Sequence, residues 1–173
     1  MANTFTQIYI HIVFAVQGRV SLIRRAWKDQ LEGYITGIVK NLGHKLITIN
    51  SRPDHIHILI GLNPKEALSD FVRQVKASSS KHANEQHWRM GRFQWQEGYG
   101  AFSVSRSVLK NVINYIELQD EHHEGRTFRH EFRGLLDKYD VKYNEAYLFD
   151  DIDPEAFCGE RKQACVAPTE LRS

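Results

Sequence analysis

The amino-acid sequence predicts an α+β protein with a ferredoxin-like split βαβ arrangement, in which an antiparallel sheet carries helices on one face and C-terminal helices follow. Segments rich in β-branched and aromatic residues alternate with amphipathic segments, in the order strand, helix, strand, strand, helix, strand, then further helices. The chain has 173 residues, 42% hydrophobic and 25% charged, which is an ordinary globular composition. The sheet face without helices would be open or covered by a partner.

Residues 7–62 supply three strands and one helix. Gln7–Phe14 is β-branched and aromatic, so we expect a first strand there. A helix is expected over about Leu22–Leu42, with Gly43 as its C-terminal cap, because apolar residues recur every three or four positions. Lys45–Asn50 and His55–Leu62 then predict a hairpin, since turn-forming residues separate them.

A second helix and a fourth strand follow. Asn63-Pro64 predicts a helix start, because a capping residue precedes proline at the first helical position. A fourth strand is expected within Gly91–Ser103, which is rich in aromatic residues and glycine. Apolar spacing predicts two further helices, over about Ser105–His122 and Phe128–Tyr139.

Composition argues against secreted and membrane classes. Cys158 and Cys165 are too few for a disulfide framework. The apolar run at the N-terminus follows no basic region and contains Gln7 and His11, which indicates a strand and not a signal peptide. No stretch approaches the roughly 18 apolar residues that span a bilayer. We therefore expect a cytoplasmic protein with no membrane contact, built as one domain over residues 1–148 with a C-terminal extension over residues 149–173.

Charge is distributed unevenly along the chain. The formal net charge of +2 suggests no strong polyanion binder. However, residues 1–110 carry 15 basic and 7 acidic side chains, whereas residues 111–173 carry 8 basic and 14 acidic ones. Such asymmetry is typical of nucleic-acid partners and favours a basic DNA surface in the first part of the chain.

Two histidines on the third strand form a candidate metal site. Side chains alternate across a strand, so His55 and His57 share one face while Ile56 and Ile58 point toward the core. Two neighbouring imidazoles suit one divalent metal. The pattern alone is weak, and by itself it favours two partly exposed histidines on a wet sheet face.

Tyr115 and Gln119 lie four residues apart and therefore on one face of the third predicted helix. A tyrosine can act as a nucleophile, and a glutamine carbonyl can add a hard ligand to a metal that two imidazoles hold. Alone, Tyr115 fits a packing residue as well, because Ile113 and Ile116 flank it.

Together these residues resemble a known family. His55-Ile56-His57 resembles the HUH motif (His, bulky hydrophobic, His), and Tyr115-Ile116-Glu117-Leu118-Gln119 resembles the YIxxQ helix of single-tyrosine HUH transposases. That family serves the smallest bacterial insertion sequences and includes the REP-associated tyrosine transposases. The resemblance covers roughly residues 5–148, and further similar stretches are Tyr9–Phe14, Pro53-Asp54, Trp95–Val104 and His122-His123.

The resemblance implies a transposase that cleaves and rejoins single-stranded DNA. Tyr115 would attack a phosphodiester and form a 5′-phosphotyrosine link, while His55, His57 and Gln119 would hold Mg²⁺ or Mn²⁺ against the phosphate. A single tyrosine needs two subunits for two cleavages, so the resemblance also implies a homodimer. In several members the tyrosine helix sits in the partner's site, and one sequence leaves open whether it does so here.

Family members also recognise DNA hairpins and single-stranded guide bases. The candidate phosphate contacts here are basic residues near the proposed site in chain order, with Arg52 and Lys76 foremost, followed by Arg73, Lys81, Arg89 and Arg92. Candidate stacking residues are Trp88, Trp95 and Tyr99. Each basic residue fits an ordinary solvated helix face as well.

Two other functions fit the same sequence features. The same fold serves nucleic-acid-binding modules, so a catalytically idle binding or regulatory module is the main alternative. A metallohydrolase that uses water, with a structural Tyr115, is another. A covalent adduct with single-stranded DNA would distinguish the transposase from both.

Overall fold

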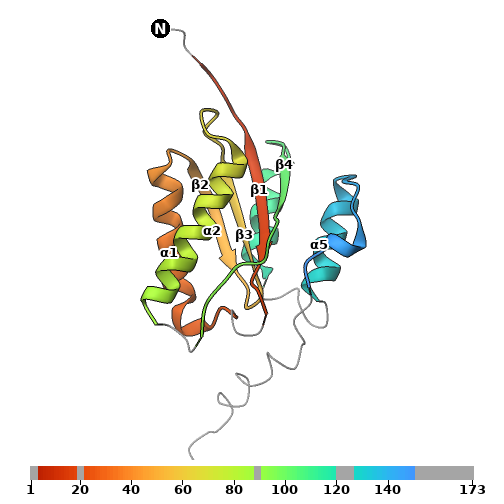
Figure 1. Ribbon diagram of the computed structural model, residues 1–173. Coiled ribbons are helices and arrows are strands. Elements are labelled where there is room, and N and C mark those ends of the chain that lie inside the picture. Colours follow the sequence, from red (N-terminus) through yellow and green to blue (C-terminus); the bar gives the residue numbers. More distant parts are fainter. Residues whose placement is uncertain (1–3, 19–21, 88–90, 120–126, 151–173) are drawn as a thin grey trace, which may run out of the picture.

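Strands and helices follow one another in the predicted order (Figure 1). The computed structural model describes residues 4–18, 22–87, 91–119 and 127–150. Its elements are β1 (Tyr9–Ala15), α1 (Arg25–Asn41), β2 (Lys45–Ser51), β3 (His55–Gly61), α2 (Leu68–Glu85), β4 (Gly100–Val104), α3 (Leu109–Glu117), α5 (Phe128–Lys138) and the 3₁₀ turn η2 (Glu145–Tyr147). The α+β class and the ferredoxin-like order are thereby confirmed. Cys158, Cys165 and the pair His122-His123 lie outside the described residues.

The four strands form one antiparallel sheet in the order β2-β3-β1-β4. β1 is central and pairs with β3 on one side and β4 on the other. In the β1–β3 pair, Val13 stands opposite His57 and His11 opposite Leu59. Because side chains alternate along each strand, His11, His55 and His57 all point to the same sheet face.

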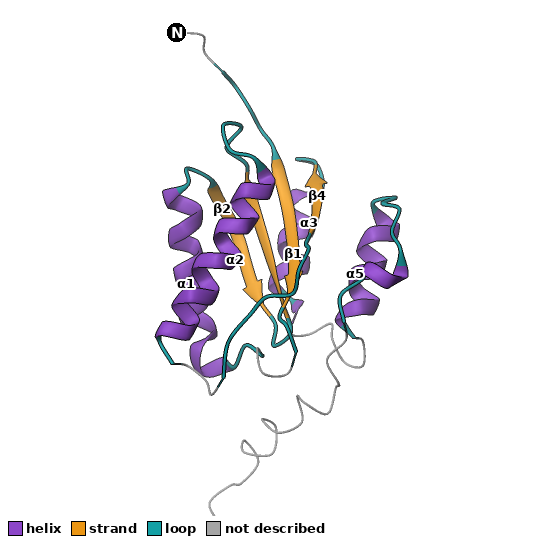
Figure 2. Ribbon diagram, viewed as in Figure 1, coloured by secondary structure: helices purple, strands orange, loops and turns teal. Residues whose placement is uncertain are grey.

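The first two helices cover the other face, as predicted (Figure 2). Ile56, Ile58 and Ile60 of β3 are fully buried beneath them. The apolar side of α1 contributes Trp27, Leu31, Ile35 and Val39, and that of α2 contributes Phe71, Val72 and Val75. α1 ends where expected, and Gly43 follows it with a φ of +75°, a conformation that glycine adopts readily.

The expectation that the histidine-bearing face is open or covered by a partner differs from the structure. Helix α3 of the same chain packs there, and Figure 2 shows it on the side of the sheet opposite α1 and α2. Its Leu109, Val112 and Ile116 pack with Leu59 of β3 and Val104 of β4. The reason is the short but strongly amphipathic sequence of α3, whose apolar stripe needs a sheet surface to cover it.

Two predicted helix boundaries also differ from the structure. α2 begins at Leu68 and not at Pro64, because the Asn63 side chain accepts a hydrogen bond from the Lys65 N–H at 3.2 Å and forms a turn instead. α3 begins at Leu109, since the serines at 105 and 107 bond to each other at 2.8 Å, and it ends at Glu117. Gln119 therefore follows the helix that carries Tyr115.

Helix α5 packs beside β4, where a glycine allows a close approach. A Cβ atom at Gly100 would lie 2.5 Å from a ring carbon of Phe132, which is buried on α5. Phe128 and Phe149 complete an aromatic cluster with Phe132. Together with the stacking of Phe128 on His55, at 4.1 Å between ring centroids, this contact places α5 against the sheet. Within the described ranges, no helix is long and apolar enough to cross a membrane.

Candidate functional site

Three potential metal ligands meet on the histidine-bearing face of the sheet. His55 and His57 come from β3 and Glu131 from α5, and one ligand atom of each lies within 4.8 Å of the others. The Nε2 atoms of His55 and His57 stand 3.5 Å and 3.3 Å from the two oxygens of the Glu131 carboxylate. Among the described residues, no other group of three such side chains is arranged to hold an ion.

The other nitrogen of each imidazole is held from behind. Nδ1 of His55 lies 2.7 Å from Oδ1 of Asp54, and Nδ1 of His57 lies 2.9 Å from Nε2 of His11. Burial raises the pKa of Asp54, but the charge of His55 and the hydrogen bond to it outweigh burial and leave the pKa below its usual value. Burial, reinforced by His57, lowers the pKa of His11 well below 6.5, so His11 is neutral.

Tyr115 projects from α3 into the same cluster. Its hydroxyl donates a hydrogen bond to Oε1 of Glu131, and its ring stands edge-on to that of His57 at 5.8 Å between centroids. Burial, together with the negative charge of Glu131, raises the pKa of the phenol far above its usual value. The resting tyrosine is therefore protonated, with a carboxylate oxygen beside its proton.

Polar contacts hold the Tyr115 helix to the sheet of its own chain. The Asn50 amide at the end of β2 donates to the carbonyl of Ile116 at 2.7 Å. The amide oxygen of Asn50 in turn accepts a hydrogen bond from Lys28 of α1 at 2.7 Å. Thr48 donates to Glu117 at 3.3 Å. Within this chain, Tyr115 consequently lies beside Glu131 and His57.

The structure also brings Gln119 to the cluster, and it adds Glu131, which the sequence had not indicated. Nε2 of Gln119 donates to Glu131 at 3.1 Å, and the glutamine is 1% exposed. Glu131 was missed because it lies on a separate helix. A signal was nevertheless present, since Glu131 falls within the apolar stripe that Phe128 and Leu135 define at helical spacing.

The donor set fits a divalent cation. Imidazole nitrogens suit transition metals, and carboxylate or amide oxygens suit Mg²⁺ and Mn²⁺. With two nitrogens, a carboxylate and the amide of Gln119 converging, a mixed N,O site suits Mn²⁺ and ions like it. The identity of the metal stays a prediction.

The predicted DNA contacts on α2 lie away from this cluster. α2 covers the isoleucine face of the sheet, opposite the histidines, so its residues do not surround the site as expected. Arg73 and Lys81 are exposed, and they pair with Asp70 at 2.9 Å and Glu85 at 3.8 Å. Arg52 lies beside the cluster, since its backbone N–H donates to the His55 carbonyl at 2.8 Å.

Lys76 and Trp95 have structural contacts that their sequence positions did not indicate. The Lys76 ammonium donates to the carbonyls of Gln96, at 2.8 Å, and Gly98, and it lies 5.0 Å from the centre of the Phe14 ring. Burial lowers the pKa of this ammonium to about 8. Trp95 packs edge-on against Phe14 and is buried, so it is not accessible for stacking on bases. Trp88 and Arg89 lie outside the described residues.

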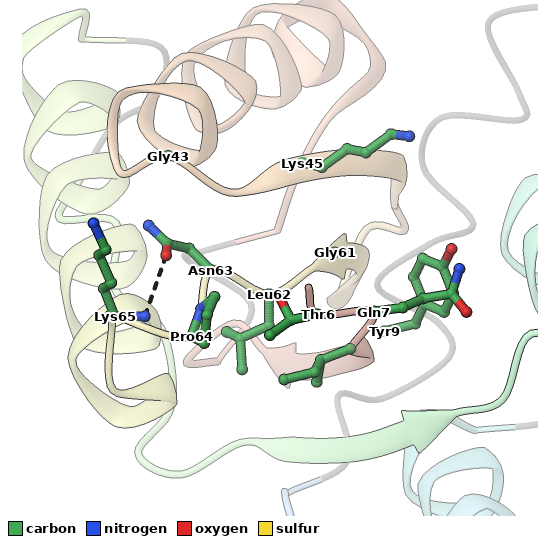
Figure 3. Close-up of a pocket in the computed structure, with 11 residues that line it drawn as sticks. Thr6, Gln7, Tyr9, Gly43, Lys45, Gly61, Leu62, Asn63, Pro64 and Lys65 are labelled. Carbon is green, nitrogen blue, oxygen red and sulfur yellow. Dashed lines mark hydrogen bonds between the residues drawn. The ribbon is translucent and has the colours of Figure 1, made fainter. Parts of the chain in front are cut away.

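A cavity of about 460 Å³ lies at the other end of the sheet. Figure 3 shows its walls, which come from the segment before β1, the start of β2 and the turn after β3. Tyr9 and Gly61, which line it, are paired at the end of the β1–β3 ladder farthest from His55. The cavity is therefore separate from the cluster of titratable residues.

Comparisons with known proteins point to one family. Residues 4–119 match the family described as "Transposase IS200 like". The ISDra2 transposase TnpA of Deinococcus radiodurans is 27% identical over 122 residues, which cover 66% of this chain and 86% of that protein. The transposase for insertion sequence element IS200 of Salmonella typhimurium is 28% identical over 131 residues, covering 70% of this chain and 82% of the relative.

Solved structures agree on the fold. A crystal structure of a transposase candidate from Deinococcus radiodurans aligns with a TM-score of 0.52 and 25% identity, covering 69% of this chain and 95% of that one. A REP-associated tyrosine transposase bound to a REP hairpin aligns with a TM-score of 0.54 and 12% identity, covering 84% and 94% of the two chains.

Proposed function

This chain belongs to the family of IS200-like transposases, and from that premise we propose that it cleaves and rejoins single-stranded DNA through a covalent bond to Tyr115. One observation carries the proposal: the Tyr115 hydroxyl, the two β3 histidines, Gln119 and Glu131 converge in a single cluster of one chain. A core-packing tyrosine would not need a carboxylate at its hydroxyl and two imidazoles behind that carboxylate.

In the proposed cleavage, the phenolic oxygen of Tyr115 forms a bond to phosphorus and the bond from phosphorus to the 3′ oxygen breaks. The phenol proton passes to the Glu131 carboxylate, whose oxygen already accepts its hydrogen bond. The leaving 3′ oxygen takes a proton from water and becomes a 3′-OH. A later attack by another 3′-OH reverses each bond change and needs no ATP, because the phosphotyrosine conserves the energy of the cleaved bond.

A divalent cation, when bound, would stabilise the negative charge that develops on the phosphate and the leaving oxygen. We propose that His55 and His57 hold it through Nε2, with an oxygen of Gln119 or Glu131. Asp54 holds the ring of His55, and the burial of both rings limits the access of water. Mg²⁺ and Mn²⁺ are the expected ions.

We further propose single-stranded DNA and DNA hairpins as partners, because the aligned REP-associated transposase binds a REP hairpin. Arg52 would contact DNA next to the cluster, and Arg73, Lys76 and Lys81 would contact a segment on the opposite face. A homodimer that acts in the cytoplasm, with residues 1–148 as the catalytic domain and 149–173 as an extension, completes the proposal.

A covalent-adduct assay tests it. The protein is incubated with Mn²⁺ or Mg²⁺ and labelled single-stranded DNA from the end of the element, and denaturing gels detect protein joined to DNA. The unsubstituted protein should form the adduct, Tyr115→Phe should form none while still binding hairpins, and His57→Ala should lose metal-dependent cleavage. Tyr147→Phe is the matched control, since Tyr147 is 87% exposed. DNA binding without an adduct in the unsubstituted protein would instead support an idle binding module.

A further inference from the structure

We propose that His11 on β1 is a positioning residue for His57, a role that rests on the proposed metal site. The register places His11 opposite Leu59, so His11 and His57 are diagonal neighbours on the same sheet face. Their rings stack with centroids 5.2 Å apart, and Nε2 of His11 lies 2.9 Å from Nδ1 of His57. Both side chains are almost completely buried, at 1% and 0% exposure.

The direction of this hydrogen bond determines what His57 can bind. An imidazole nitrogen that binds a cation uses its lone pair, so the ring proton must lie on the other nitrogen. Nε2 of His57 faces Glu131 at 3.3 Å, which leaves the proton on Nδ1 when a cation is bound. That proton needs an acceptor within the protein, and Nε2 of His11 is placed to accept it.

The neighbouring ligand shows the same arrangement with a different acceptor. Nδ1 of His55 faces the Asp54 carboxylate at 2.7 Å, and its Nε2 faces Glu131 at 3.5 Å. Each histidine therefore has one nitrogen directed to the shared carboxylate and the other to a fixed partner. Partners of this kind hold a ligand's tautomer and ring orientation, and their loss commonly weakens metal binding about ten- to a hundredfold.

The test separates hydrogen bonding from ring packing. His11→Phe keeps a planar ring of similar size among Phe102 and Tyr115, whose rings lie 6.1 Å and 6.3 Å away, but it offers no acceptor. His11→Gln offers an amide oxygen at about the place of Nε2. The matched control is His44→Asn, since His44 is also buried but accepts from the Asn63 N–H at 2.9 Å, far from the cluster.

Mn²⁺ binding is measured by the spin-resonance signal of the free ion, with folding checked by amide NMR spectra. We expect His11→Phe to raise the Kd for Mn²⁺ about tenfold or more, His11→Gln to recover most of that loss, and His44→Asn to match the unsubstituted protein. Equal binding by His11→Phe and the unsubstituted protein would overturn the role, and so would equal losses in His11→Phe and His11→Gln.

A second measurement distinguishes failure of this role from failure of the proposed metal site. With ¹⁵N-labelled histidine, the metal-free protein should show an imidazole N–H shared by His11 and His57 that exchanges slowly with solvent and is lost in His11→Phe. Absence of that signal would overturn the pairing even if Mn²⁺ binds. If the signal is present but the unsubstituted protein does not bind Mn²⁺, the metal site is wrong, and the positioning role is overturned with it.

Discussion

Asn50→Ala should release the helix that carries the tyrosine. The Asn50 amide donates to the Ile116 carbonyl at 2.7 Å, one residue from Tyr115, and accepts from Lys28 at 2.7 Å. The Ile116 carbonyl lies in the last turn of α3, where carbonyls have no partner within the helix. Asn50 therefore satisfies the hydrogen-bonding capacity of a carbonyl at the end of α3, and it links α1, the sheet and α3.

The loss in the free energy of unfolding follows from these two contacts. Asn50 is 8% exposed, so its removal leaves the buried Ile116 carbonyl unsatisfied, which costs about 1–3 kcal/mol. The Lys28 side chain is 24% exposed, and its contact with Asn50 adds roughly 0.5–1 kcal/mol because solvent screens it. We expect a loss of about 2–3 kcal/mol in the free energy of unfolding, and an adduct rate at least about tenfold lower, because Tyr115 is less well positioned.

Urea unfolding monitored by circular dichroism measures the first quantity, and the adduct assay at a temperature well below unfolding measures the second. Asn111→Ala is the control, since Asn111 is exposed on the same helix and its loss should change stability by no more than about 0.5 kcal/mol. If Asn50→Ala destabilises no more than Asn111→Ala, Asn50 does not hold the helix and the reasoning is refuted.

Three further outcomes are expected. An equimolar mixture of the Tyr115→Phe and His57→Ala variants should form no adduct, because the phenol and the histidines lie together within one chain. Restored cleavage in the mixture would show instead that the tyrosine works in the partner's site. Gly100→Ala should lower the free energy of unfolding in urea by about 1–3 kcal/mol, because its methyl group would collide with the buried ring of α5, and an unchanged value would contradict that contact. Lys76→Ala should lower the thermal midpoint by several degrees and Lys81→Ala hardly at all, since only the first holds loop carbonyls within the described structure; equal shifts would argue against this.

Local signals were enough to predict the strands and helices and their order, but not that α3 covers the histidine-bearing face. Strand alternation placed His55 and His57 on one face, and helical spacing located α1 and α5 to within a few residues. The start of α2 was wrong because the Asn63 side chain can satisfy a turn as well as a helix N-terminus, and local sequence does not decide between them.

The site was predictable only where its residues share an element or a motif. Tyr115 and Gln119 are close in sequence, so their spacing predicted a shared location. Glu131 and His11 join the cluster through packing between distant segments, which depends on how α5 meets β4 at Gly100 and on the β1–β3 register. The distance of Lys76 from the cluster has the same cause, since chain order does not reveal which sheet face a helix covers.

The most direct test of the central claim is peptide mapping of the protein–DNA adduct by mass spectrometry. After digestion with protease and nuclease, the account predicts a nucleotide joined through its 5′ phosphate to the peptide that contains Tyr115, formed only when Mg²⁺ or Mn²⁺ is present. A nucleotide on another tyrosine, or cleaved DNA with a free 5′ phosphate and no adduct, would contradict it.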